Sequence, residues 1–225
     1  MAARDIGPGE LETGSSFVLG EPALVCRWRI HGGELPMLNR HMRALGARTV
    51  NDAPATTELV AWAKQRIEWN LSSGASRYPD GVLMLVVDRS GQAAMTVGPY
   101  QPLERTDARF LVARAKDARR EAATSGVAPE TLWAVRDGAL VWGAESGEAP
   151  SAAASLIEGL AKTVGLPVRR DPALVSGLLG KRGHVYDEAF LVSDEHGVVP
   201  ASDRAGMRGD KFARGWERLL ERDGR

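Results

Sequence analysis

The stretch Asp137-Gly138-Ala139-Leu140-Val141-Trp142-Gly143 decides how the second half of this chain folds. Asp-Gly is a strong signal for a tight turn, and apolar runs stand on both sides of it. The pattern predicts a β-hairpin that pairs residues 131–135 with residues 139–142. Working outward from this hairpin, further strands and helices alternate along the chain, which predicts a mixed α/β protein of the α+β type.

Hydrophobic periodicity and turn residues place the other elements. Strands are predicted over residues 23–30, 35–38, 81–87, 93–97, 166–169 and 189–192. Helices are predicted over residues 39–45, 58–71, 151–164 and 211–222, with Ser151 as the cap of the third. Residues 107–125 fit one helix capped by Thr106, or a strand over 109–113 followed by a loop. Helix propensity favours the single helix.

Glycine and proline content divides the chain into three segments. Residues 1–20 are Gly-rich and polar, which predicts a flexible leader. Gly98-Pro99-Tyr100-Gln101-Pro102 is the strongest internal boundary, because glycine and proline both interrupt regular structure. We therefore expect an N-terminal α/β lobe over residues 21–100 and a C-terminal α/β lobe over residues 101–225.

Charge and composition exclude several partners. The chain has 29 basic and 29 acidic residues, so no long-range field favours nucleic acid or an anionic membrane surface. No apolar run approaches the roughly 20 residues of a membrane-spanning helix, and the first residues lack the order of a signal peptide. Cys26 is the single cysteine, which suits a reducing compartment. We expect a cytoplasmic protein that binds neither nucleic acid nor membranes.

The chain lacks the common motifs of metal and phosphate chemistry. Its four histidines show none of the spacings typical of zinc ligands, so we expect no metal site. The Gly-Lys-containing segment 176–183 has neither the glycine spacing nor the hydroxyl residue of a phosphate-binding P-loop.

Three further blocks join the hairpin in a resemblance to a known family. Residues 25–45 are similar to a family pattern F-E-T-x-R…G…H-x-x-R-L, and residues 81–99 to its L-R-x-x-V-T-R-G strand and hairpin. Residues 186–200 are similar to A-D-E-x-F-L-T-S-S-x-x-G-x-x-P-V. In this order the blocks resemble the class IV aminotransferases, which include aminodeoxychorismate lyase. The resemblance implies a shortened, two-lobed fold of that type, a homodimer and a site between the lobes.

Proteins of this family hold pyridoxal phosphate (PLP) between the lobes, and the resemblance implies that its anchors are replaced here. Ala44 and Met84 stand where the family has arginines, and Trp142 stands where a glutamate holds the pyridine nitrogen. Asp194 stands at a phosphate-binding hydroxyl, where its charge would repel a dianion. The position of the Schiff-base lysine falls on Asp107. We therefore expect no cofactor, with PLP the less favoured alternative.

Three hypotheses for function follow from the resemblance. The first is a protein that binds or transforms a small carboxylate or amino-acid-like ligand between the lobes without PLP. Asp194, with a raised pKa, is then the candidate acid or base. The other cleft candidates are Arg29, Arg43, Met84, Trp142 and Ser193. The second hypothesis is a non-catalytic dimeric scaffold. The third is an active PLP-dependent lyase or aminotransferase that uses Lys116, the nearest lysine.

Overall fold

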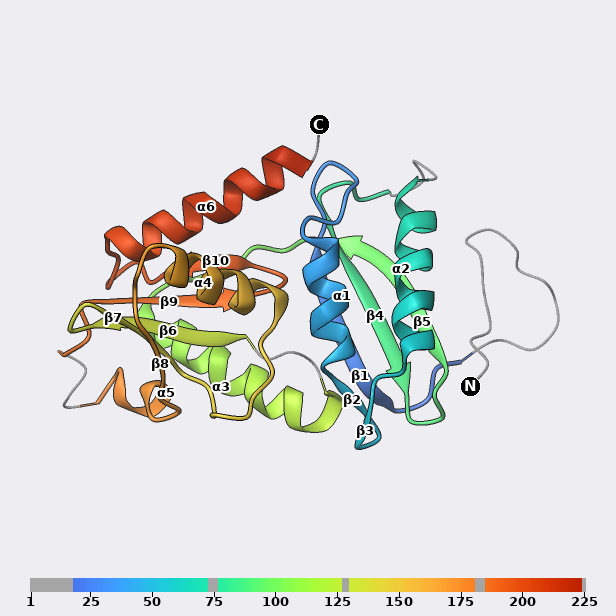
Figure 1. Cartoon of the computed structure of the whole chain (residues 1–225), viewed down its shortest axis with the longest axis horizontal. Coiled ribbons are helices and arrows are strands. Elements are labelled where there is room, and N and C mark those ends of the chain that lie inside the picture. Colours follow the sequence, from blue (N-terminus) through green and yellow to red (C-terminus); the bar gives the residue numbers. More distant parts are fainter. Residues whose placement is uncertain (1–17, 73–76, 127–129, 181–184, 224–225) are drawn as a thin grey trace.

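The computed structural model describes residues 18–72, 77–126, 130–180 and 185–223. These residues form two α/β lobes that lie side by side, each built on its own sheet (Figure 1). The sheet of the N-terminal lobe is antiparallel, and that of the C-terminal lobe is mostly antiparallel. The predicted two-lobed α+β architecture is therefore confirmed. The leader predicted over residues 1–20 lies outside the described residues except for its last three positions. None of the described helices combines the length and hydropathy needed to cross a membrane.

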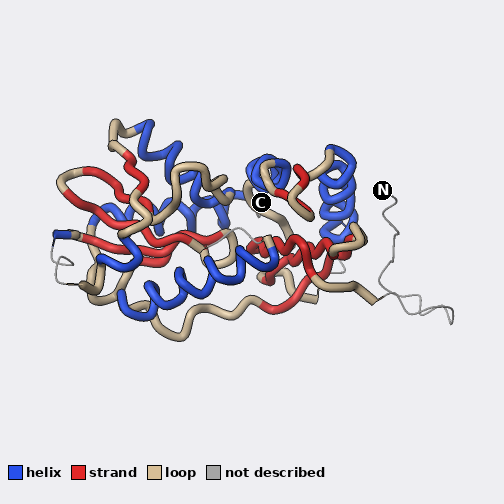
Figure 2. Tube along the Cα trace, turned by 90° about the horizontal axis from the view of Figure 1, so that it is seen from below, coloured by secondary structure: helices blue, strands red, loops and turns tan. Residues whose placement is uncertain are grey.

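The N-terminal lobe has a three-stranded antiparallel sheet in the order β1-β4-β5, with two helices on one face (Figure 2). Alternate residues of a strand point to opposite faces. Leu24 and Trp28 of β1 therefore enter the core under the helices, whereas Arg27 and Arg29 lie on the face that is free of them. The elements are β1 (Pro22–Arg29), α1 (Leu38–Gly46), β2 (Thr49–Val50), β3 (Ala53–Pro54), α2 (Thr57–Ser72), β4 (Gly81–Asp88) and β5 (Ala93–Pro99).

The C-terminal lobe has a five-stranded sheet in the order β10-β9-β6-β7-β8, in which only the β7–β8 pair is parallel. Helices α4 and α6 cover one face and α3 and α5 the other, so that the lobe has two apolar cores. The elements are α3 (Ala108–Ser125), β6 (Thr131–Arg136), β7 (Ala139–Trp142), α4 (Ala152–Thr163), β8 (Val168–Arg170), α5 (Leu174–Gly177), β9 (Glu188–Ser193), β10 (Gly197–Pro200) and α6 (Met207–Asp223).

The hairpin predicted from Asp137-Gly138 forms as β6 and β7, with both turn residues at positive φ. The segment before it is the single helix α3, and the alternative of a strand followed by a loop is wrong. Its cap is Asp107, whose side chain accepts a hydrogen bond from the Phe110 amide, and not Thr106. Carboxylates are strong helix N-caps, so the position matched to the family's lysine acts here as a cap.

One predicted strand is absent, and one strand was not predicted. No strand forms over residues 35–38, because Met37 adopts a left-handed conformation with φ 58° and α1 begins directly after it. Conversely, residues 197–200 form β10, which pairs with β9. This strand was not predicted because four residues are too few to show a clear hydrophobic alternation. Gly197 makes this hairpin possible, since its φ is 71° and a side chain there would collide with Trp216.

Candidate functional site

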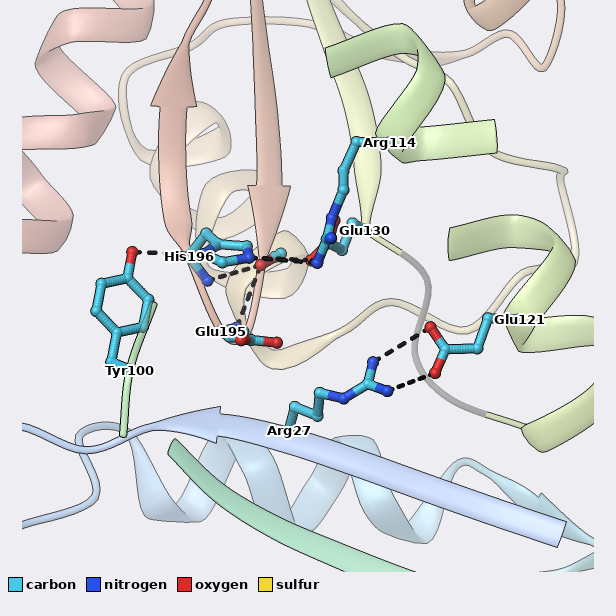
Figure 3. Close-up of polar contacts among 8 residues, drawn as sticks. Arg27, Tyr100, Arg114, Glu121, Glu130, Glu195 and His196 are labelled. Atoms are coloured by element: carbon cyan, nitrogen blue, oxygen red, sulfur yellow. Dashed lines mark hydrogen bonds and ion pairs between the residues drawn. The ribbon is translucent and has the colours of Figure 1, made fainter. Parts of the chain in front are cut away.

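Side chains from both lobes meet where β1 faces the turn between β9 and β10. The Arg29 amide of β1 donates to the Asp194 carbonyl of that turn at 3.0 Å, which joins the lobes through the backbone. Arg27 binds Glu121 of α3 through two hydrogen bonds, of 3.2 Å and 2.5 Å (Figure 3). We call the region where the two lobes meet, between β1 and the turn after β9, the cleft. Arg27 and Arg29 can both reach it because strand alternation places them on the sheet face that no N-terminal helix covers.

The turn that follows β9 is folded by its own serine. The Ser193 hydroxyl accepts hydrogen bonds from the Glu195 amide at 3.2 Å and from the His196 amide at 2.8 Å. Such local bonds compete with a regular strand and fix a turn. As a result Glu195 and His196 point toward the cleft, and the Ser193 hydroxyl is committed to the turn although the residue borders a cavity.

His196 sits in a chain of polar contacts that runs from one lobe to the other (Figure 3). Its Nε2 is 3.3 Å from an Arg114 nitrogen and its Nδ1 is 3.4 Å from the Tyr100 hydroxyl. Arginine can only donate, so Nε2 accepts and the proton lies on Nδ1, directed at Tyr100. Burial, opposed by the charge of Glu130 and reinforced by the neighbouring arginines, lowers the pKa of His196 to about 4. The imidazole is therefore neutral near pH 7.

Two glutamates flank this histidine. Arg114 holds Glu130 through hydrogen bonds of 2.6 Å and 3.0 Å. Burial and then the negative charge of Glu130 raise the pKa of Glu195. Together with His196 these carboxylates offer three ligand atoms within 4.8 Å, an arrangement that could hold a metal ion. The Arg114 guanidinium already supplies a positive charge to this cluster, so electrostatics gives a metal ion little advantage there.

A cavity of about 170 Å³, distinct from the one that Ser193 borders, lies beside this cluster. Its lining residues are Arg29, Tyr100, Glu195, His196, Val198, Ala213, Trp216, Glu217 and Leu220. Arg29 stacks over the Tyr100 ring at 3.4 Å from its centre. Among the described residues, Nη1 of Arg29 is buried and has no hydrogen-bond partner. Burial lowers the pKa of this guanidinium below its usual range. A desolvated cation with an unused donor is a binding group for an anion.

Asp194 has a different role from the one predicted. Its carboxylate is buried and accepts hydrogen bonds from the Ala153 amide at 2.7 Å and the Ala152 amide at 3.3 Å, at the N-terminus of α4. Burial alone would raise the pKa of Asp194, but nearby His41 and these amides hold it below its usual range. The predicted raised pKa is therefore wrong, because His41 and then the amides of the helix N-terminus stabilise the negative charge by more than burial destabilises it.

Trp142 stands at the position where the resemblance places a cofactor-binding glutamate. It is buried and stacks on Trp133 with the ring centres 4.9 Å apart, and the Arg170 guanidinium lies over its ring at 4.1 Å from the ring centre. Arg170 in turn donates to the carbonyl groups of the loop at residues 145, 146 and 148. Trp142 thus belongs to the core of the C-terminal lobe and lines none of the described cavities.

The other predicted site residues divide between the cleft and the surface. Arg29, Ser193 and Asp194 border the cleft, as expected from their positions. Met84 lies on the same sheet face as its neighbour Arg27 but borders none of the described cavities. Arg43 is exposed and bonds the Asn39 carbonyl of its own helix, and Lys116 is exposed on α3.

Several residues of the cleft were missed by the sequence interpretation. They are Arg27, Arg48, Tyr100, Arg114, Glu130, Glu195 and His196. The run Asp194-Glu195-His196-Gly197 after a buried strand was a usable signal, since a polar turn that ends in glycine places side chains at a sheet edge. Arg114 and Glu130 carried no signal, because only the packing of α3 against the sheet brings them to the turn.

This fold is that of the class IV aminotransferases and 4-amino-4-deoxychorismate lyases. A hypothetical aminotransferase from Mycobacterium tuberculosis in its PLP-bound form matches with a TM-score of 0.57 and 14% identity over 94% of both chains. An aminotransferase from Brucella abortus bound to PLP matches with a TM-score of 0.57 and 14% identity over 92% of this chain and 95% of that one. The 4-amino-4-deoxychorismate lyase from Pseudomonas aeruginosa matches with a TM-score of 0.55 and 16% identity, over 90% and 94% respectively.

At these identities the likeness is one of fold. No family model and no curated protein matches the sequence. The resemblance found in the three sequence blocks and the hairpin is confirmed by these solved structures.

The solved structures also correct the expectation that no cofactor accompanies this chain's fold. Two of them are bound to PLP, so the fold's cofactor is PLP. The expectation rested on replaced side chains, whereas the helix N-terminus, an anion-binding feature of the backbone, is present at α4. In the arrangement seen here the Asp194 carboxylate occupies the Ala152 and Ala153 amides, which does not fit a phosphate at the same helix end.

Proposed function

We propose that this protein binds a small amino-acid-like carboxylate in the cavity between its lobes. The observation that carries the proposal is Nη1 of Arg29, a buried guanidinium nitrogen without a hydrogen-bond partner in the described structure. Leaving a charged donor unpaired and desolvated is costly, and a carboxylate would satisfy it. Arginine and carboxylate match in geometry as well as in charge.

The remaining lining supports a ligand that also carries a positive group. Glu195 and Glu217 border the same cavity, and Tyr100 and His196 provide further polar atoms. A carboxylate at Arg29 and an ammonium group at Glu195 would pair each charge of an amino acid with an opposite charge. The volume of about 170 Å³ restricts the ligand to a small molecule. Val198 and Leu220 leave room for an apolar side chain.

Loss of the Arg29 charge is expected to weaken binding by about 10- to 100-fold, the usual worth of a hydrogen bond to a charged group. The experiment is titration of the purified chain with amino acids and their amides, followed by nuclear magnetic resonance of the Trp216 indole, which borders the cavity. Arg29→Met should lose binding and Arg29→Lys should retain part of it. Arg43→Met, an exposed arginine outside the cleft, is the matched control.

Two results would overturn the proposal as a whole, and a third would overturn its assignment of a carboxylate. One is a panel of amino acids and carboxylates that leaves the indole resonance of the unaltered protein unchanged, which would favour a non-catalytic scaffold. The other is binding that Arg29→Met and Arg43→Met reduce equally. If the amino-acid amides bind as tightly as the free acids, the Arg29 guanidinium does not recognise a carboxylate.

A further inference from the structure

Helices α4 and α6 cover the same face of the five-stranded sheet (Figure 1). A groove separate from the cleft is lined by residues of these two helices and of the segment that follows α4. Its volume is about 710 Å³, within the range of roughly 300–1,000 Å³ that is typical of sites for small molecules. The lining residues are Leu160, Val164, Leu166, Met207, Arg208, Lys211, Phe212, Arg214, Gly215 and Arg218.

The walls of this groove leave large apolar side chains in contact with water. Leu160 is 37% exposed, Val164 is 58% exposed and Met207 is 86% exposed. These three account for nearly half of the exposed large hydrophobic residues in the described part of the chain. Phe212 completes the apolar lining from the inner side of α6. Apolar side chains gathered at one concave place, and not scattered singly, indicate a binding surface.

The rim of the groove is cationic. Lys211, Arg214 and Arg218 follow Met207 on one stripe of α6, because residues spaced three or four apart share a helix face. Arg208 adds a fourth cation, and no acidic residue lines the groove. Within the described residues none of these four side chains forms an ion pair. The groove therefore joins an apolar wall to a positive edge in a chain whose overall net charge is zero.

We propose that this groove binds a free long-chain carboxylate, a molecule with one apolar chain and one anionic head. The chain would lie against Leu160, Val164 and Met207, and the head would meet Arg214 and Arg218. Charge complementarity selects an anion, and the apolar walls select a chain longer than the ligand proposed for the cleft. A second copy of this face is disfavoured, because a two-fold contact would set the cations of one copy against those of the other.

The groove's dimensions favour a single chain over a partner helix. An amphipathic helix needs apolar anchors spread over several turns of a groove wide enough for a cylinder of about 10 Å. Here the wall opposite α6 offers only three apolar side chains, all between residues 160 and 166. A flexible chain of methylene groups can follow such a short wall.

The experiment is isothermal titration of the full chain with dodecanoate, kept below its micelle concentration, and with dodecanol as the uncharged equivalent. Dodecanoate is expected to bind at one site, and dodecanol at least about tenfold more weakly, since it lacks the head that the cations hold. Arg214→Glu should weaken dodecanoate binding by at least about tenfold, and Val164→Asp should weaken both ligands. Arg109→Glu, an exposed charge reversal on α3, is the matched control.

The proposal fails if dodecanoate does not bind, or if Arg214→Glu and Arg109→Glu bind it equally. It also fails if the groove takes an acidic amphipathic peptide or vesicles of anionic lipid while free dodecanoate gives no heat. Retention of the wild-type melting temperature in each variant, all altered at exposed positions, separates lost binding from lost folding.

Discussion

Asp194→Ala is expected to lower the free energy of unfolding by about 3–5 kcal/mol, the range for removing one partner of a buried charged group. The substitution leaves the Ala152 and Ala153 amides without their acceptor at the N-terminus of α4. It also removes the negative charge 3.6 Å from Nδ1 of buried His41. Because Arg29 bonds the same turn through its backbone, the loss would affect both lobes.

Urea unfolding followed by tryptophan fluorescence measures this change. Asp117→Ala is the control, since Asp117 pairs with Arg120 on the exposed side of α3 and such pairs contribute well under about 1 kcal/mol. Asp194→Asn should lie between the two, because an amide keeps one acceptor but brings a donor against the helix amides. A stability of Asp194→Ala within about 1 kcal/mol of the unaltered protein would contradict this account of the turn.

The sign of the pH dependence follows from the lowered pKa of Asp194. A carboxyl whose folded pKa is depressed stabilises the fold above its unfolded value of about 3.9. This contribution is lost as the pH falls below that value toward the folded pKa. Asp194 therefore stabilises the protein throughout the neutral and mildly acidic range.

The sequence predicted the architecture because its strongest signals are local. Asp137-Gly138 specified a hairpin through its backbone preferences, and Ser151 capped α4 as expected. These features depend on neighbouring residues alone, so one sequence is enough to show them. Arg29 was likewise placed at the cleft, although its strand neighbour Arg27 was missed.

The site was less predictable because it depends on long-range packing. Arg114, Glu130 and His196 are separated by up to 82 positions, and no spacing rule connects them. Asp194 was correctly placed at the cleft but given the wrong titration behaviour, since burial and hydrogen bonding shift a carboxyl in opposite directions. His41, and after it the two amides at α4, outweigh burial, and only the folded structure brings them to this carboxylate. The exposure of Arg43 and Lys116 could likewise not be predicted, because it depends on which faces of α1 and α3 pack against the sheets.

His196 is expected to make stability fall as the pH is lowered from about 6.5 to about 4, by up to about 3 kcal/mol. Its folded pKa is about 4, against an ordinary value of 6.5. Between pH 4 and pH 6.5 this imidazole is protonated in the unfolded chain but stays neutral in the folded protein, so a lower pH favours unfolding. Each unit of pKa difference corresponds to about 1.4 kcal/mol. Below about pH 4 both states are protonated and this loss stops.

The measurement is urea unfolding at pH 7 and pH 4.5 for the unaltered protein and for His196→Asn, which has no group titrating in this window. His31→Asn is the control, because that side chain is 35% exposed. Glu195 acts in the opposite sense, since its raised pKa makes protonation favour the folded state. Repeating the pair in a Glu195→Gln background separates the two groups. If His196→Asn loses as much stability on acidification as the unaltered protein in both backgrounds, the imidazole is not held neutral between the lobes.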